Sequence, residues 1–359
     1  MENKYKISVV IPVYNSSAFI NKCMNSLYKQ DFKKPFEIII IDDASTDNTL
    51  EIIKKWNLLN INFFSLTLNS GPSTARNIGI KHAKGEYIYF LDADDAIQIN
   101  TFSKLYKAAK EKNYDMVFAD VKNLETKKDQ RNNIFFFNKS KTFYKKNILH
   151  ELKKRFYDPL YYGGLIGCTG RLIKRYILIK NKVFFNEKLR ITEDETFSWA
   201  ILAYVKKAKY IKEKLYSYYI NPNVKTAVAV GFKYQLSISK YKLISKVVKK
   251  TFKKFNLKKK EINKLGDQAL VYMIISSLIS FSRSIILGKF NLKKGKQIRK
   301  NFIKKIVNDR SVIKSIKNYT VSINENYLIP KAITERDAKI LELACVNRAK
   351  EILQLRRST

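Results

Sequence analysis

The stretch Glu86–Asp95, EYIYFLDADD, joins an aromatic-rich alternating run to three carboxylates. The alternation is typical of a β-strand, and Asp92, Asp94 and Asp95 follow where that strand would end. Carboxylates this close repel one another unless a cation or bound donors neutralise them. A divalent ion held by one or two carboxylates and by the phosphates of a ligand is the usual neutraliser. An acidic turn with helix-capping aspartates explains this stretch equally well, so the preceding sequence has to decide.

The first hundred residues alternate between strand patterns and helix patterns. Near-continuous apolar runs predict buried strands, and apolar residues at helical spacing follow them. Such alternation predicts an α/β fold, with a mainly parallel central sheet, flanking helices and right-handed crossovers. The predicted strands are Ile7–Val13, Phe36–Ile41, Asn62–Leu66 and Tyr87–Leu91.

Three of these predicted strands end in residues that suit a binding site. The ends carry Pro12–Asn15, Asp42–Asp43 and Asp92–Asp95. Ligands of parallel α/β sheets bind at the carboxyl ends of the strands. Asp42 and Asp43 could form a simple turn, but two acids directly after a wholly apolar strand favour binding. The sequence therefore predicts a ligand site along this edge of the sheet.

The composition points to anionic partners. The chain has 359 residues, 45% of them hydrophobic, and a formal net charge of +39. A charge of this size indicates nucleic acid, anionic lipid or phosphorylated substrates as partners, and says little about the fold. Cys23, Cys168 and Cys345 are spaced for neither a disulfide framework nor a zinc site. We expect no signal peptide, and no membrane-spanning segment because the apolar run Ala269–Phe281 is too short.

The positive charge is concentrated towards the C-terminus. Residues 230–359 contain 31 Lys and Arg against 8 Asp and Glu. Lysine doublets on helical patterns predict a basic helical region at 229–359, after an α/β domain at 1–228. Its surface could simply be solvated, could lie on an anionic membrane, or could bind nucleic acid. We favour the membrane, because no nucleic-acid-binding motif accompanies the charge.

Five segments, taken in order, resemble the inverting glycosyltransferases of family 2. They span Ile7 to Phe197 and read ISVVIPVYN, EIIIIDDASTDNT, NSGPSTARNIGI, GEYIYFLDADD and TEDETF. The resemblance implies the GT-A fold, a nucleotide-diphospho-sugar donor, most commonly UDP-linked, and Mn²⁺ or Mg²⁺ as cofactor. It also implies that residues 1–115 bind the donor and that residues 116–228 provide the acceptor site and the catalytic base.

The same resemblance assigns residues to the donor. Pro12, Val13 and Tyr14 would line the pocket of the base, with Tyr14 against a uracil ring. Asp43 would accept a hydrogen bond from uracil N3–H. Arg76 would lie near the nucleotide or its phosphates. Residue by residue, packing for Tyr14 and a solvated helix position for Arg76 stay open as alternatives.

The resemblance assigns the chemistry to two acidic motifs. Asp92 would face the ribose, with Ala93 beside it, and Asp94 would ligate the metal that bridges the diphosphate. Asp194 would be the catalytic base. A bound cation stabilises a leaving diphosphate, and a base removes the proton of an acceptor hydroxyl. One carboxylate opposite the leaving group suffices for a single displacement, which inverts the anomeric centre.

The segment around Asp194 has a structural alternative. Thr192 and Glu195 read as a T-x-x-E capping box, and acids favour the first turn of a helix. Capping and catalysis are compatible, because Asp194 can point into the cleft while its neighbours cap. The segment Tyr161–Gly170, YYGGLIGCTG, could be a lid, an acceptor groove or a set of turns.

We therefore expect a metal-dependent glycosyltransferase that builds a bacterial surface glycan such as a lipopolysaccharide, a capsule or a lipid-linked oligosaccharide. We expect it to lie on the cytoplasmic face of the membrane as a peripheral protein. The first alternative is a non-catalytic scaffold that binds nucleotide-sugars, which the intact acidic motifs disfavour. The second is a nucleic-acid-binding protein that uses its basic tail.

Overall fold

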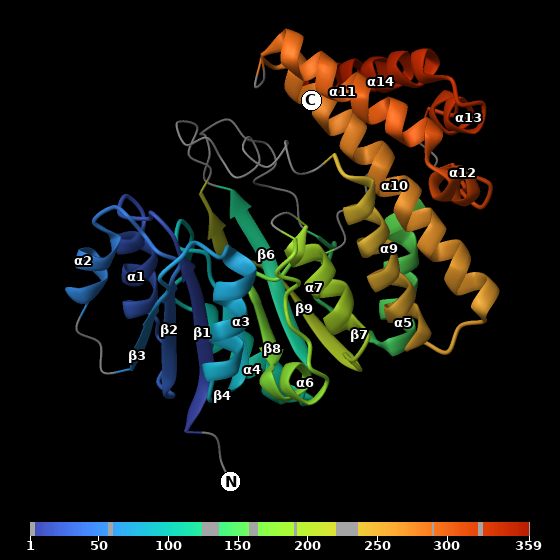
Figure 1. Ribbon diagram of the computed structural model, residues 1–359. Coiled ribbons are helices and arrows are strands. Elements are labelled where there is room, and N and C mark those ends of the chain that lie inside the picture. Colours follow the sequence, from blue (N-terminus) through green and yellow to red (C-terminus); the bar gives the residue numbers. More distant parts are fainter. Residues whose placement is uncertain are drawn as a thin grey trace. The chain divides into compact units, whose positions relative to one another are not determined.

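The computed structural model describes residues 4–56, 60–123, 136–157, 164–189, 192–219, 236–288, 291–321 and 326–358 (Figure 1). The chain forms two compact units. The α/β unit consists of Met1–Leu149 and Gly163–Val224, and the helical unit consists of His150–Tyr162 and Lys225–Thr359. The predicted domain boundary at residue 228 lies outside the described residues.

A nine-stranded sheet forms the centre of the α/β unit, in the order β3-β2-β1-β4-β8-β6-β9-β5, with β7 paired to β9. The first four strands are parallel, as predicted. The other half mixes directions, because β8 runs antiparallel to β4 and β6 while β9 runs parallel to β6. The strands are β1 Tyr5–Val13, β2 Phe36–Asp42, β3 Ile61–Ser65, β4 Gly85–Phe90, β5 Ala96–Ile97, β6 Met116–Asn123, β7 Lys141–Tyr144, β8 Arg171–Lys174 and β9 Lys207–Tyr218.

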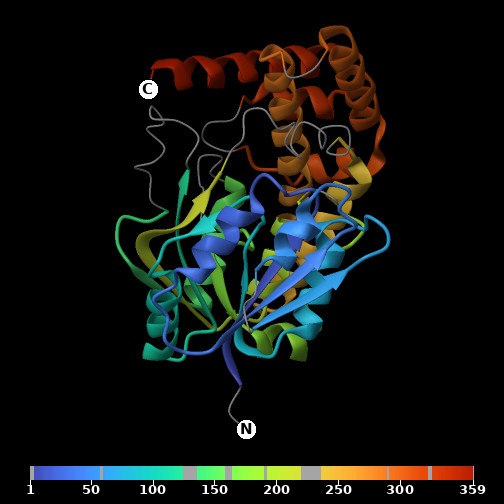
Figure 2. The same cartoon turned by 90° about the vertical axis from the view of Figure 1, so that its left-hand side faces the viewer.

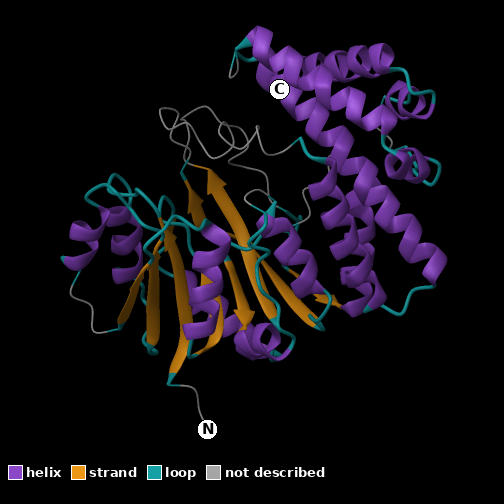
Figure 3. Cartoon of the chain, in the orientation of Figure 1, coloured by secondary structure: helices purple, strands orange, loops and turns teal. Residues whose placement is uncertain are grey.

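Helices cover both faces of this sheet (Figures 2 and 3). Side chains alternate between the faces of a strand, so Val9 of β1 joins the core beneath α1 and α4, whereas Val10 meets α3. Gly79 of α3 lies so close to Val10 that an added Cβ would be 2.3 Å from its Cγ1. The helices of this unit are α1 Ile20–Tyr28, α2 Thr49–Lys54, α3 Pro72–His82, α4 Thr101–Glu111, α6 Arg175–Lys180 and α7 Glu193–Leu202, and α5 Lys145–Tyr157 continues into the helical unit.

The helical unit confirms the predicted helical C-terminal region. Its longest helix, α10, packs against α9, α11, α12 and α14. Its helices are α9 Ile238–Lys253, α10 Lys259–Ile286, α11 Leu292–Asn308, α12 Arg310–Ile316, α13 Leu328–Thr334 and α14 Ala338–Ser358.

Helix α10 extends well beyond the apolar run Ala269–Phe281, which was predicted to be too short to span a membrane. The helix has 28 residues and is long and apolar enough to cross a membrane. Two thirds of its most apolar window is buried inside the protein. Buried side chains such as Val271, Ile274 and Leu278 show that it forms the core of the helical unit. A core helix of a soluble fold passes the same length and composition test.

Candidate functional site

The acidic segment after β4 divides into three carboxylates with different surroundings. Asp92 is partly exposed, Asp94 is exposed and Asp95 is buried. Tyr216 of β9 donates a hydrogen bond of 2.5 Å to Asp95 Oδ2, and the Tyr219 amide donates one of 2.9 Å to Oδ1. Burial and the negative charge of Asp92 raise the pKa of Asp95 to about 9. Asp95 therefore ties the acidic segment to β9, and Asp92 and Asp94 are the more accessible carboxylates of the segment.

Asp94 has the properties of a single carboxylate ligand for a hard cation. Surrounding protein atoms and the charge of Asp92 raise its pKa, although a backbone hydrogen bond and Arg76 act in the opposite direction. Among the described residues, no group of three or more His, Cys, Asp and Glu side chains could hold a metal alone. Mg²⁺ and Mn²⁺ commonly take one or two carboxylates and complete their shell with substrate phosphates and water. The residues present therefore fit a metal that arrives with a diphosphate.

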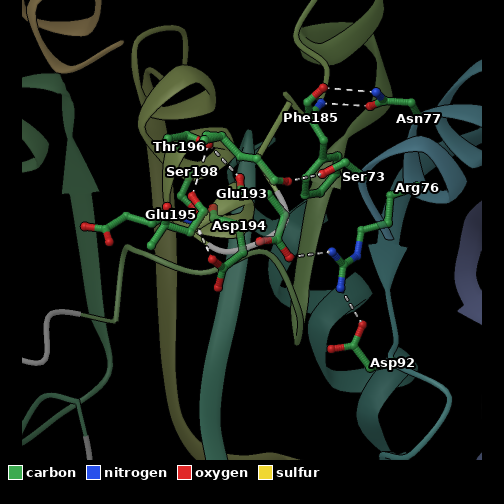
Figure 4. Close-up of polar contacts among 12 residues, drawn as sticks. Ser73, Arg76, Asn77, Asp92, Phe185, Glu193, Asp194, Glu195, Thr196 and Ser198 are labelled. Carbon is green, nitrogen blue, oxygen red and sulfur yellow. Dashed lines mark hydrogen bonds and ion pairs between the residues drawn. The ribbon is translucent and has the colours of Figure 1, made fainter. Parts of the chain in front are cut away.

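Arg76 of α3 joins the two acidic motifs (Figure 4). Its Nη2 lies 2.8 Å from Asp92 Oδ1, and its Nη1 lies 3.4 Å from Glu193 Oε1. The guanidinium is buried and lies 5.3 Å from the centre of the Phe185 ring. The alternative of a solvated helix position for Arg76 is therefore wrong. One cation holds together residues separated by about a hundred positions in the sequence.

Helix α3 also holds the chain that leads into α7. The Asn77 side chain accepts a hydrogen bond from the Phe185 amide at 2.7 Å and donates to the Phe185 carbonyl at 3.0 Å. The Ser73 hydroxyl donates to the Leu189 carbonyl at 3.3 Å. Figure 4 shows these contacts beside the bridge through Arg76. The STARN sequence of α3 thus holds the backbone at Phe185 and Leu189, which precede α7 in the chain.

The first turn of α7 carries the predicted base. Thr192 is the N-cap residue with φ of 64°, and its side chain makes no capping hydrogen bond to the helix. The hydrogen bond that the Thr192 side chain would accept in the predicted capping box is therefore not formed at this end of α7. Asp194 Oδ1 instead accepts from the Glu195 amide at 2.7 Å. Asp194 is half-buried at a helix N-terminus, and among the described residues its second oxygen, Oδ2, has no hydrogen-bond donor.

Glu193 is a functional candidate that the sequence reading missed. Burial and the neighbouring charge of Asp194 raise its pKa to about 7, although Arg76 acts in the opposite direction. Its side chain is 13% exposed. The adjacent acids Glu193 and Asp194 at the predicted start of a helix indicate a functional site in the sequence. Their spacing does not show which of the two contacts Arg76.

Aromatic packing fixes α7 from behind. Phe197 stacks on Phe185 with ring centres 3.7 Å apart, and both rings pack edge-on against Phe90 of β4. The Gly167 amide donates to the Ser198 hydroxyl at 2.9 Å, so residues after Gly164 reach α7. Tyr161 and Tyr162, named in the prediction of a lid or acceptor groove, lie outside the described residues. Residues 164–170 form turns up to a bridge at Thr169.

The predicted base pocket lies at the ends of β1 and β2. Val13 is buried, Pro12 is half-buried and Tyr14 is 48% exposed. An exposed ring at a strand end can stack on a ligand, whereas the packing alternative would bury it. The carboxylate of Asp43 is buried and accepts from the amides of Ser70 and Gly71, each at 2.7 Å. Asp43 therefore orders the loop before α3, and each oxygen retains a lone pair for a further donor.

Comparison with known proteins adds evidence for the family. A family model described as Glycosyl transferase family 2 matches residues 8–172. The chain is 30% identical over 217 residues to Glycosyltransferase GlyG of Streptococcus pneumoniae, an alignment that covers 59% of this chain and 70% of GlyG. It is also 30% identical over 216 residues to the poly(ribitol-phosphate) beta-N-acetylglucosaminyltransferase TarS of Staphylococcus aureus, covering 59% of this chain and 35% of TarS. This chain thus spans about a third of the length of TarS.

A solved structure confirms the predicted fold. The crystal structure of S. aureus TarS 1–349 in complex with UDP-GlcNAc aligns with a TM-score of 0.69 at 21% identity. The alignment covers 96% of this chain and 92% of that one. At this identity the likeness establishes the fold alone, and it includes the helical C-terminal region. The predicted GT-A architecture is confirmed.

Proposed function

Because the chain belongs to glycosyltransferase family 2, we propose that it transfers a sugar from a UDP-sugar to an acceptor hydroxyl with inversion. The observation that carries this proposal is the bridge from Asp92 through Arg76 to Glu193. It places the acidic segment after β4 beside the acid pair of α7, so a leaving diphosphate and an acceptor base can act on one bound sugar.

The donor would lie along the carboxyl ends of β1, β2 and β4. Tyr14 supplies an exposed ring for a uracil base, and Asp43 supplies an ordered carboxylate near it. Asp92 would contact the ribose beside Ala93, and Asp94 would hold Mn²⁺ or Mg²⁺. A metal at that position would stabilise the negative charge of the departing UDP. The complex of the structural relative with UDP-GlcNAc supports a UDP-sugar as the donor class.

Asp194 would take the proton from the acceptor hydroxyl. The backbone of α7 orients its carboxylate through the Glu195 amide, and base catalysis of this kind contributes about a hundredfold to ten-thousandfold in rate. Glu193 and Arg76 would hold α7 at a fixed distance from the donor phosphates. Only one carboxylate is needed on the acceptor side, which is why inversion is the expected outcome.

The acceptor would be a hydroxyl of a growing surface glycan or a lipid-linked glycan. The name of the TarS relative refers to poly(ribitol-phosphate), which supports a polymer as the acceptor class. The expected position on the cytoplasmic face of the membrane stays a prediction, and so does the alternative of a nucleotide-sugar-binding scaffold.

Nucleotide release from a panel of UDP-sugars tests the proposal. Slow hydrolysis of one donor is expected with Mn²⁺, and loss of release is expected with EDTA or in Asp94→Ala. Asp194→Asn should keep UDP binding and lose transfer to an acceptor. Calorimetry that detected no binding of UDP or of any UDP-sugar to the wild-type protein would refute the proposal.

A further inference from the structure

The end of α10 and the start of α11 lie at one end of the helical unit (Figure 1), and both carry exposed apolar side chains. Ile286 and Leu287 end α10 with 42% and 48% of their surface exposed, and Leu292 begins α11 with 56% exposed. Most apolar side chains of this unit are buried instead. We define Ile286, Leu287 and Leu292 as the apolar tip.

Two described backbone features flank the apolar tip. Gly288 follows the tip residues of α10 with φ of 70°, a conformation that glycine adopts without strain. Asn291 caps α11 by accepting a hydrogen bond from the Lys294 amide at 3.0 Å. The exposed side chains are therefore presented by two helix ends.

Three lysines that pair with no acid among the described residues adjoin the apolar tip. Lys293, Lys294 and Lys296 lie in the first turn and a half of α11 and are exposed. Helix α11 contains no Asp or Glu between Leu292 and Asn308. Elsewhere in the same unit lysines pair with acids, as Lys242 does with Asp309. Like charges on neighbouring turns destabilise a helix, so the stability of α11 does not account for these lysines.

An anionic membrane surface offers a partner to both groups: its headgroups would attract the three lysines, and its acyl boundary would receive the apolar tip. Lysines near such a surface gain about 1 kcal/mol each from anionic headgroups. Leucine and isoleucine side chains gain by leaving water for the acyl boundary. A soluble polyanion would satisfy the lysines but would leave the apolar tip in water. We propose that the apolar tip and Lys293, Lys294 and Lys296 form a docking surface for anionic lipid bilayers.

The rest of the helical unit supports shallow docking. The apolar side of α11, including Phe302, Ile303 and Ile306, is buried in the core. Most of α10 is buried as well. Among the described residues of α10 and α11, the large exposed apolar side chains are therefore confined to the apolar tip, and binding is expected to be reversible. The docking surface does not depend on the proposed function.

Vesicle flotation of the full chain tests the docking surface. Wild-type protein is expected to float with vesicles of phosphatidylcholine and phosphatidylglycerol, and to stay in solution with phosphatidylcholine alone. The triple variant Lys293→Gln, Lys294→Gln, Lys296→Gln should weaken binding about a hundredfold, which corresponds to three lysine contacts. The double variant Leu287→Ser, Leu292→Ser should weaken it at least tenfold without changing the salt dependence.

Matched controls come from the same unit. Lys258, Lys260 and Lys264 are exposed near the other end of α10, about 30 Å or more away along the helix. Their replacement by Gln changes the net charge equally and should alter binding less than threefold. Ile340→Ser with Leu343→Ser, on the exposed side of α14, controls for lost apolar surface.

Each outcome decides the proposal. Absence of wild-type flotation with the anionic vesicles would overturn it. Equal losses in the control and test variants would also overturn it, because net charge alone would then explain binding. Binding to poly(ribitol phosphate) that needs the three lysines but not Leu287 or Leu292, without vesicle binding, would assign the surface to a polymer instead. UDP binding, measured in parallel, should be unchanged in every variant.

Discussion

Replacement of Arg76 by Met should destabilise the α/β unit by about 3 kcal/mol at pH 8.5. Arg76 is the buried cation between Asp92 and Glu193, and removal of one partner of a buried ion pair typically costs about 3–5 kcal/mol. We expect a loss at the lower end of this range because 30% of the Asp92 side chain is exposed to water. The substitution keeps most of the packing volume, so the loss is mainly electrostatic.

The loss of stability caused by Arg76→Met should become smaller as the pH falls. Glu193 faces Asp194 on its own helix, Arg76 on α3 and Asp92 after β4, and its pKa is raised to about 7. Without Arg76 the pKa rises further, so Glu193 binds a proton below neutral pH and one uncompensated charge disappears. A carboxyl group whose folded pKa exceeds the unfolded value destabilises the protein as pH rises between the two values. The free energy lost in the variant should therefore be smaller at pH 6 than at pH 8.5.

Urea unfolding followed by tryptophan fluorescence measures this effect in the α/β unit. The chain has two tryptophans, Trp56 and the fully buried Trp199 of α7, and both belong to the α/β unit. Lys81→Met, at an exposed position of the same helix, is the control and should cost less than about 0.5 kcal/mol. Glu193→Gln added to Arg76→Met should restore part of the loss at pH 8.5. Equal stabilities of Arg76→Met and wild type at pH 8.5 would refute the reasoning.

Three further substitutions test other contacts. Asn77→Ala removes two hydrogen bonds to Phe185 and leaves buried backbone groups unpaired; it should cost about 2–4 kcal/mol in the same assay, and no loss would contradict the anchoring role of α3. Tyr216→Phe removes the hydroxyl that donates a hydrogen bond to Asp95. This variant should raise the KM for the UDP-sugar more than it lowers kcat, and a change in kcat alone would argue against a role of Asp95 in ordering the acidic segment. Gly79→Ala places a methyl group against β1; it should cost about 1–3 kcal/mol, and a neutral thermal melt would contradict the close approach.

Local patterns predicted the parallel half of the sheet well. Apolar runs placed β1, β2 and β4 within a residue or two of their observed positions, because each is buried on both faces. The antiparallel strands β8 and β5 were not predicted. They are short, with four and two residues, and their positions depend on partners distant in the sequence.

The candidate site divides in the same way. Its strand-end residues could be predicted, because the carboxyl ends of parallel strands meet at one edge. The roles of Glu193 and Tyr216 could not be predicted, since each depends on a tertiary contact across more than a hundred residues. The predicted capping by Thr192 was wrong: its backbone is left-handed, and its side chain makes no capping hydrogen bond to α7.

The way α3 holds the segment before α7 has a consequence for evolution. Asn77 and Ser73 grip this segment through backbone atoms of Phe185 and Leu189. The side chains at 184, 186 and 188 are not buried. Mutations at these three positions are therefore expected to leave the anchoring of Phe185 and Leu189 to α3 unchanged. Relatives can diversify the sequence of this segment while keeping the same backbone contacts with α3.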